Sequence, residues 1–150
     1  MVPKIEYKDL GYDFTIELVD KVPKELKNEF KETLSAIDKD IIDYYFELKN
    51  NITLSYLINI QDNHIGYCSL FEDETYWNLY EIYIKEEFRE LGIGTKLFQV
   101  IKEDSKKINK KIRTYTLPSD RRAKNFYESN RITARILIME EKRAGSRYKI

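Results

Sequence analysis

The sequence contains a single cysteine, Cys68, and a single histidine, His64. One cysteine cannot form a disulfide within the chain, which favours a reducing compartment, most simply the cytoplasm. Neither residue has the partners that a nucleophilic triad requires, and no cluster of potential ligands indicates a metal site. We therefore expect Cys68 in the core, His64 in a turn, and a protein that uses no metal.

Long hydrophobic runs are also absent. No apolar stretch approaches the roughly 20 residues of a membrane-spanning helix, and the first residues, MVPKIEYKDLGYDF, contain no apolar signal core. The chain has only five glycines and three prolines, and it shows no repeat, low-complexity tract or flexible linker. Its 150 residues, 42% hydrophobic and 35% charged, lead us to expect one domain over residues 1–150 and no membrane partner.

The net charge of zero hides an asymmetry along the chain. The first hundred residues carry a net charge of −9 and the last fifty a net charge of +9. A basic third favours a ligand that carries phosphates, either a small molecule or a nucleic acid. Solvated charges on helix faces would explain the same asymmetry. Because neither a DNA-recognition helix nor a strand motif with aromatic residues for nucleic-acid binding is recognisable, nucleic acid is the less favoured partner.

The hydrophobic pattern predicts a mixed α/β fold. Apolar residues spaced by three and four predict one long or two consecutive helices over residues 26–48, and helices over 92–109 and 120–130. Strand-like patterns occur over residues 13–18, 52–60, 65–71, 75–84, 112–117 and 132–140. The strand at 75–84 is apolar on both faces, so we expect it at the centre of the sheet. The order predicts a mostly antiparallel sheet with a strand–helix–strand crossover in its second half, followed by a loosely held tail.

The stretch FRELGIG, Phe88–Gly94, lies between the predicted central strand and a helix. The first N–H groups of a helix have no internal partners and, with the helix dipole, form an anion site. Glycine lets a phosphate approach the backbone closely, and Arg89 adds positive charge. The stretch is neither a P-loop nor a complete dinucleotide fingerprint. A helix start that merely needs a tight turn is the plainer alternative.

The wider segment, YEIYIKEEFRELGIGTKLF, resembles the acyl-CoA-binding segment of the GNAT superfamily of acyl-CoA N-acyltransferases. Arg89, Gly92 and Gly94 fit the family pattern Arg/Gln-x-x-Gly-x-Gly/Ala. The apolar strand end that the family places just before this pattern is Ile82–Ile84. The small residue that often follows the motif arginine is replaced by Glu90.

A second segment, DRRAKNFYESNRI, is similar to the family pattern Asn-x-x-Ala-x-x-Phe-Tyr-x-x-x-Gly-Phe. Ala123, Phe126 and Tyr127 match it in register, whereas Asp120 and Arg131 replace its asparagine and glycine. The two segments together make the resemblance specific, and the order of strands and helices fits it over nearly the whole chain.

The resemblance implies a GNAT-like fold that transfers an acetyl group from acetyl-CoA to a small-molecule or protein amine by direct attack. It implies Tyr127 as the general acid for the departing thiolate, although packing against the sheet is the alternative for this residue. Glu81, the only carboxylate inside the central strand, is the candidate general base. The residues implied in acyl-CoA binding are Ile82, Tyr83, Ile84, Arg89, Glu90, Leu91, Gly92, Ile93, Gly94, Thr95, Asp120, Ala123, Lys124 and Tyr127.

Three questions about partners stay open at this point. The acidic first hundred residues favour a cationic acceptor, since the family places its acceptor site beside the N-terminal helices. A module of the same fold that binds acyl-CoA without turnover is the alternative to an enzyme. A homodimer is a further partner that we consider.

Overall fold

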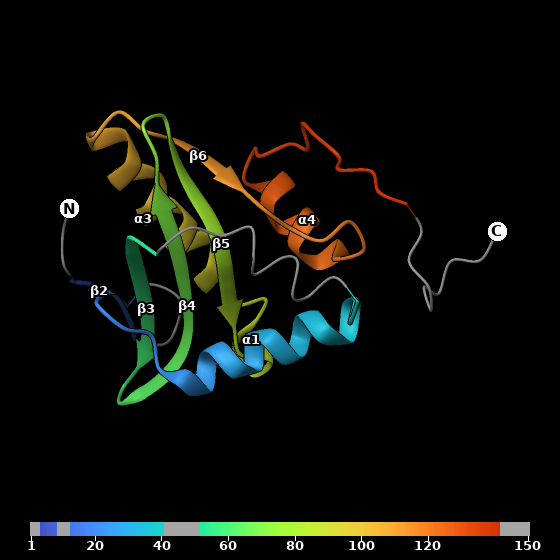
Figure 1. Ribbon diagram of the computed structural model, residues 1–150. Helices are drawn as coiled ribbons and strands as arrows, with labels where there is room; N and C mark the ends of the chain where they lie inside the picture. Colours follow the sequence, from blue (N-terminus) through green and yellow to red (C-terminus); the bar gives the residue numbers. More distant parts are fainter. Residues whose placement is uncertain (1–3, 9–12, 41–51, 142–150) are drawn as a thin grey trace.

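The computed structural model describes residues 4–8, 13–40 and 52–141 (Figure 1). One sheet contains six strands in the order in which they occur in the chain. They are β1 (Lys4–Tyr7), β2 (Phe14–Val19), β3 (Leu54–Ile60), β4 (Asn63–Glu72), β5 (Tyr76–Ile84) and β6 (Lys111–Thr114). Strands β1 to β5 run antiparallel to their neighbours, whereas β6 pairs with β5 in parallel. The predicted mixed, mostly antiparallel sheet is therefore confirmed.

Helices cover both faces of this sheet (Figure 1). Those described are α1 (Lys24–Ile37), the short 3-10 helix η1 (Glu86–Phe88), α3 (Ile93–Lys107) and α4 (Arg121–Ser129). Helix α3 connects β5 to the parallel strand β6, which is the crossover that the sequence predicts. Within the described ranges, no helix is both long and apolar enough to cross a bilayer.

Two hydrophobic cores lie on opposite faces of the sheet. On one face, Leu97, Phe98 and Ile101 of α3 pack in a cluster with Trp77 and Leu79 of β5. On the other face, α1 contributes the buried side chains Leu26, Phe30 and Leu34 to a cluster that contains Tyr80 and Tyr83 of β5. Because β5 supplies both clusters and has a strand on each side, its predicted central position is confirmed.

The largest departure from the predicted elements is at residues 132–140, which do not form a strand. Their alternation is suited to a strand, but a strand also needs a neighbour whose backbone groups it can pair with. Only Ile132 of this apolar series packs against a core, and its N–H donates to the carbonyl of Tyr127 at 3.0 Å. Beyond it, Figure 1 shows the chain running away from β6, and Ile136 is 84% exposed.

Smaller departures concern element ends. Strand β1 was not predicted, β6 ends at Thr114 rather than residue 117, and His64 lies in β4 rather than in a turn. Helix α1 ends at Ile37, where the N–H of Asp38 donates to the carbonyl of Leu34 at 2.9 Å. Residues 41–48 of the predicted helix, and the tail from 143 to 150, lie outside the described residues.

Candidate functional site

The parallel strands β5 and β6 diverge in the middle of β5. Their pairing runs from Tyr76 opposite Lys111 to Leu79 opposite Thr114, and the N–H of Tyr115 donates once more to the carbonyl of Leu79 at 3.2 Å. Beyond this point, no described strand lies beside β5 on that edge. Backbone groups at such an edge can bind an extended ligand by hydrogen bonds.

A β-bulge in β5 determines where Glu81 lies. Ser69 of β4 is opposite Glu81 and Leu70 is opposite Leu79, so Tyr80 is an additional residue in β5. As a result, Tyr80 and Glu81 both face the α1 core. The hydroxyl of Tyr67 donates to Glu81 Oε1 at 2.8 Å, and Glu81 is only 2% exposed. The candidate base is therefore a buried carboxylate that accepts a hydrogen bond from the Tyr67 hydroxyl.

The loop between β5 and α3 folds back onto the end of the strand. Arg89 Nε donates to the carbonyl of Ile84 at 2.7 Å, and its guanidinium carbon lies 5.4 Å from the ring centroid of Tyr83. Glu90 and Gly92 both have positive φ angles, 62° and 84°. Gly92 is the N-cap of α3; glycine adopts its left-handed conformation without steric cost. The first N–H groups of α3 have no helical acceptors, so they are available to an anion.

Gly94, the second residue of α3, is closely surrounded by side chains. A Cβ at this position would lie 3.1 Å from Cε1 of Phe126 and 3.2 Å from Cδ1 of Ile84, closer than ordinary contacts of 3.4–4 Å. The sequence suggested that glycine leaves room for a phosphate here. The structure adds a second reason, because glycine lets α3 approach α4 and the end of β5.

A cavity of about 660 Å³ connects the end of β5, the start of α3, α4 and the inner face of α1. Ten of the fourteen residues predicted to bind acyl-CoA line it: Ile82, Tyr83, Ile84, Arg89, Glu90, Gly92, Gly94, Thr95, Asp120 and Ala123. Leu91, Ile93, Lys124 and Tyr127 are not part of the lining. Leu91 is exposed, and Ile93 belongs to the core on the α3 face.

The cavity also contains residues that the sequence analysis did not assign to it. They are Phe30, Thr33, Leu34 and Ile37 of α1, Glu86 and Phe88 of η1, and Arg122 and Phe126 of α4. The apolar spacing of α1 predicted its buried stripe but not that part of the stripe would border a cavity. Phe126 lies inside the second family motif, which was the available signal for this residue.

Helix α4 positions one aromatic residue at the cavity and its neighbour in the core. Asp120 caps the helix, because its Oδ1 accepts a hydrogen bond from the N–H of Ala123 at 3.1 Å. Phe126 lines the cavity, and its ring is perpendicular to that of Phe98 at a centroid distance of 6.0 Å. Tyr127 is 4% exposed and belongs to the α3-face core. The candidate acid thus lies behind the cavity wall.

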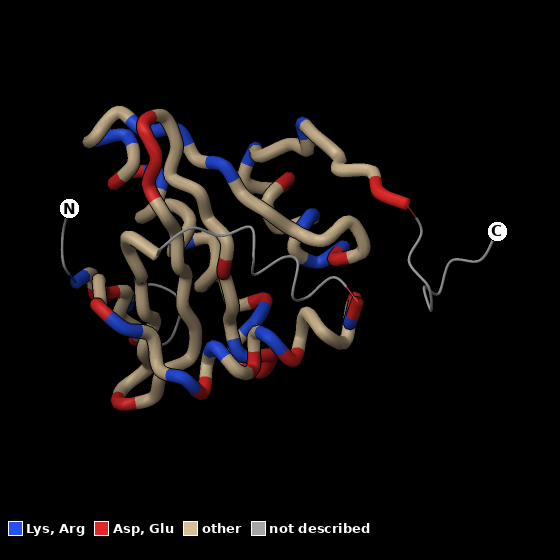
Figure 2. Tube along the Cα trace, viewed as in Figure 1, with Lys and Arg blue, Asp and Glu red and all other residues tan. Residues whose placement is uncertain are grey.

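The electrostatic environment differs between the two ends of the cavity. Burial, followed by the nearby Glu29 carboxylate, raises the pKa of Tyr83, so this phenol keeps its proton at neutral pH. Lys85 Nζ lies 3.5 Å from Oε1 of Glu25 and 3.7 Å from Oε2 of Glu29. Figure 2 shows basic positions along β6 and α4, whereas α1 carries acidic and basic positions in equal number. The α4 side is therefore suited to anions, whereas the charges of α1 balance.

The remaining groups with reactive potential do not form a second centre. Cys68 is fully buried, which confirms its predicted place in the core. Burial, followed by the nearby Glu81 carboxylate, raises the pKa of its thiol, so it is a poor nucleophile. His64 Nδ1 lies 2.5 Å from Asn59 Oδ1 in the β3–β4 hairpin, away from the cavity lining. Among the described side chains, no group of three or more His, Cys, Asp or Glu is arranged to hold a metal ion.

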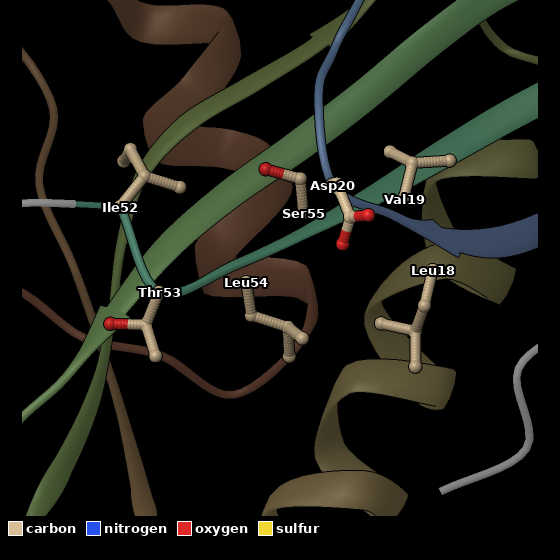
Figure 3. A pocket seen from close by; sticks show the side chains of 7 residues that line it. All are labelled: Leu18, Val19, Asp20, Ile52, Thr53, Leu54 and Ser55. Carbon is tan, nitrogen blue, oxygen red and sulfur yellow. The ribbon is translucent and has the colours of Figure 1, made fainter.

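A smaller pocket of about 180 Å³ lies between the end of β2 and the start of β3 (Figure 3). Its lining is Leu18, Val19, Asp20, Ile52, Thr53, Leu54 and Ser55. Among its described lining residues Asp20 alone is charged, and the hydroxyl of Ser55 already lies 2.8 Å from that of Ser69. Without a basic side chain it is unsuited to phosphates, so the larger cavity is the candidate functional site.

Comparisons with known proteins identify the family of the chain. The family model described as an acetyltransferase (GNAT) domain matches residues 51–130. No curated protein sequence matches the chain.

Solved structures show the same fold. A GNAT family acetyltransferase from Elizabethkingia anophelis with acetyl-CoA bound is 22% identical, with a TM-score of 0.57 over 78% of this chain and 74% of that one. An aminoglycoside acetyltransferase from an uncultured soil sample is 15% identical, with a TM-score of 0.61 over 89% and 97% of the two chains. A GNAT family protein from Streptococcus pneumoniae is 14% identical, with a TM-score of 0.59 over 86% and 99%. At these identities the likeness concerns the fold alone.

Proposed function

The chain belongs to the GNAT family of acetyltransferases, and from this premise we propose that it transfers an acetyl group from acetyl-CoA to a cationic amine. The observation that carries the proposal is the 660 Å³ cavity. It brings together the edge of β5 that no described strand pairs with, the N-terminus of α3 and the inner face of α1. A phosphate-bearing ligand and an amine can therefore meet in one cavity.

The residues on the α3 and α4 side fit acetyl-CoA. Free N–H groups at the start of α3 and the guanidinium of Arg122 would bind its pyrophosphate, and the backbone of Ile82–Ile84 would bind its pantetheine arm. Arg89 donates from Nε to Ile84, but a guanidinium has further N–H donors for a phosphate. When bound, acetyl-CoA supplies an activated thioester. Glu90 is exposed, so its carboxylate can stay in water.

The residues on the α1 side offer an amine acceptor an apolar surface. Phe30, Leu34 and Ile37 give this end of the cavity an apolar wall, and Thr33 adds a hydroxyl. The net charge of −9 that residues 1–100 carry would raise the local concentration of cations. An aliphatic di- or polyamine would place its methylene groups on the apolar wall and an outer ammonium group beside the cavity-lining carboxylate of Glu86.

Two buried side chains are the proposed proton carriers. As the amine nitrogen bonds to the acetyl carbon and the carbon–sulfur bond breaks, Glu81 would take the proton that the amine loses. The hydroxyl of Tyr67, which donates a hydrogen bond to Glu81 Oε1, would hold the carboxylate in place. Tyr127 would give its proton to the departing sulfur. Its burial, next to the cavity-lining Phe126, keeps this donor away from bulk water.

A module that binds acyl-CoA without turnover is the second candidate. It is favoured by one observation, since Glu81 and Tyr127 both lie behind the cavity wall rather than in its lining. The two candidates agree on acetyl-CoA binding and differ in whether free thiol appears when an amine is added.

Calorimetric titration with acetyl-CoA tests the part of the proposal that both candidates share. Arg122→Ala is expected to weaken binding about fivefold, since an exposed charge contact is worth about 1 kcal/mol. Arg121 is the matched control, because it is an exposed neighbour on the same helix that does not line the cavity. Equal affinities for the two alanine variants, or no binding by the folded wild type, would contradict the proposal.

A further inference from the structure

A row of four residues crosses the face of the sheet that α1 covers, from the smaller pocket to the candidate base. The register places Val19 of β2 opposite Ser55 of β3, Ser55 opposite Ser69 of β4, and Ser69 opposite Glu81 of β5. Side chains opposite each other in antiparallel strands share a face, with Cβ atoms about 4.5–5.5 Å apart. Because Val19 and Ser55 line the pocket of about 180 Å³, the row connects this pocket to Glu81.

The two serines of this row form a hydrogen bond in the interior of the protein. Their hydroxyl oxygens are 2.8 Å apart, and either hydroxyl can be the donor. Ser55 is 3% exposed and Ser69 is 0% exposed. A hydroxyl that accepts one hydrogen bond can still donate another, so two neighbouring hydroxyls can pass a proton along. The pair therefore has the chemistry of a proton path as well as that of a structural contact.

Glu81, at the inner end of the row, is shielded from bulk water. It is 2% exposed and does not belong to the lining of the larger cavity. The hydroxyl that donates to its Oε1 belongs to Tyr67, which is buried as well. A base that takes a proton from each amine must lose that proton before the next turnover. For a carboxylate in this position, the proton needs a path through protein groups.

We propose that Ser69 and Ser55 carry this proton from Glu81 to water in the smaller pocket; the inference rests on the proposed role of Glu81 as the base. Glu81 gives its proton to the oxygen of Ser69, and the hydroxyl proton of Ser69 passes to the oxygen of Ser55. The hydroxyl proton of Ser55 then passes to a water molecule in the pocket. Glu81 is a carboxylate again, each serine keeps one proton, and one proton leaves for each acetyl group transferred. Since either serine can donate, the hydroxyls can turn back between turnovers.

The smaller pocket is suited to receive the proton. Its volume of about 180 Å³ is large enough for water, and its lining includes polar side chains. Figure 3 shows Asp20 and Ser55 in the wall of this one pocket. Asp20 and Thr53 are exposed, so the pocket opens to solvent. The carboxylate of Asp20 favours the positive charge of a proton that arrives from Ser55.

Thiol release followed from the first turnover, with acetyl-CoA and an aliphatic diamine in excess, tests the proposal. Ser69→Ala keeps Glu81, so the first acetyl transfer on each protein molecule is expected at the wild-type rate. Later turnovers require the proton to leave, and their rate should fall about tenfold, less than the loss of a base itself would cause. The variant should therefore show a burst of one thiol per protein before a slow phase. Ser105→Ala is the control, because Ser105 is also buried but lies on α3, where it donates to the carbonyl of Lys102.

A double variant separates the proton path from a loss of stability. Ser69→Ala alone takes away the hydrogen-bond partner of Ser55, whereas the double variant Ser55→Ala, Ser69→Ala removes both hydroxyls and should unfold at a urea concentration nearer to that of the wild type. The proposal predicts the same slow phase for the double variant as for either single variant, because one break interrupts the path. A slow phase that disappears as stability recovers, or single variants with the wild-type steady rate, overturns the proposal.

Val19→Phe tests the pocket as the exit. The larger side chain would fill the pocket opposite Ser55 and leave both hydroxyls in place. We expect the same burst and slow phase, with an unchanged circular dichroism spectrum. A folded Val19→Phe variant with the wild-type steady rate overturns the exit through this pocket. A wild type that releases no thiol with any amine contradicts the proposed function and the proton path with it, whereas an active wild type with equally active serine variants contradicts the path alone.

Discussion

Substitution of Gly94 tests how tightly α3, α4 and β5 pack around the cavity. A Cβ at this position would lie 3.1 Å from Cε1 and 3.5 Å from Cζ of Phe126, and 3.2 Å from Cδ1 of Ile84. The phenyl ring cannot easily retreat, because it packs edge-on against the buried Phe98 and against Tyr127. Relief must therefore come from small shifts of Phe126 and Ile84, and both residues line the cavity.

The expected magnitudes follow from these contacts. For Gly94→Ala, two neighbours must move by a few tenths of an ångström, at a cost of about 1 kcal/mol. Alanine regains up to about 1 kcal/mol through its higher helix propensity, so the free energy of unfolding should stay within about 1 kcal/mol of wild type. Gly94→Val adds two more methyl groups, and we expect it to lose about 2–3 kcal/mol. We also expect at least a tenfold loss of acetyl-CoA affinity for the valine variant, or about 1.4 kcal/mol.

Urea denaturation and calorimetric titration of both variants measure these two quantities. A double-mutant cycle with Phe126→Leu identifies the neighbour involved, since the smaller side chain should recover part of the valine variant's loss in affinity. A valine variant with wild-type stability would show that Phe126 and Ile84 do not crowd position 94. The assignment of the cavity to acetyl-CoA would be refuted by a folded valine variant with wild-type affinity.

Three further predictions concern catalysis. Tyr127→Phe should lower kcat and kcat/KM together, by about 100-fold or less, with little change in acetyl-CoA affinity. Tyr83→Phe is the control and should keep kcat within about twofold. A larger loss of kcat for Tyr83→Phe than for Tyr127→Phe would make Tyr83 the proton donor. Tyr67→Phe should reduce kcat and lower the free energy of unfolding in urea by about 1–3 kcal/mol, because the buried Glu81 loses a hydrogen-bond donor. An unchanged kcat would contradict a role for Glu81 in the mechanism. Raising the salt concentration should lower kcat/KM for a polyamine more than for a monoamine, and equal sensitivity would contradict the cationic acceptor.

Much of the fold is predictable because its signals are local. The period of α3 and the two apolar faces of β5 are encoded in consecutive residues, and both elements were predicted to within a few residues. The strand expected at residues 132–140 was wrong because alternation encodes suitability for a strand, whereas pairing depends on a neighbour distant in sequence. The exposure of Ile136 could not be derived from the sequence pattern.

The location of the site was predictable from local motifs, whereas the orientation of its side chains was not. The motif around Gly92 located the N-terminus of α3, because a left-handed turn and a helix start have residue requirements that are visible in sequence. The face of Glu81 depends on a bulge at Tyr80, and no residue pattern in β5 reveals a bulge. Likewise, the Phe-Tyr pair in α4 placed both aromatic residues near the site, but only packing against α3 decides that Phe126 borders the cavity and Tyr127 is buried.

The release of free thiol from acetyl-CoA, followed in the presence of a panel of amines, tests the central claim most directly. We predict release that depends on both protein and amine, fastest with aliphatic di- and polyamines, with a mass increase of one acetyl group on the acceptor. Acetyl-CoA that binds but yields no thiol with any amine would leave an acyl-CoA-binding module and contradict the enzyme. A folded protein that neither binds acetyl-CoA nor releases thiol would contradict the account of the cavity itself.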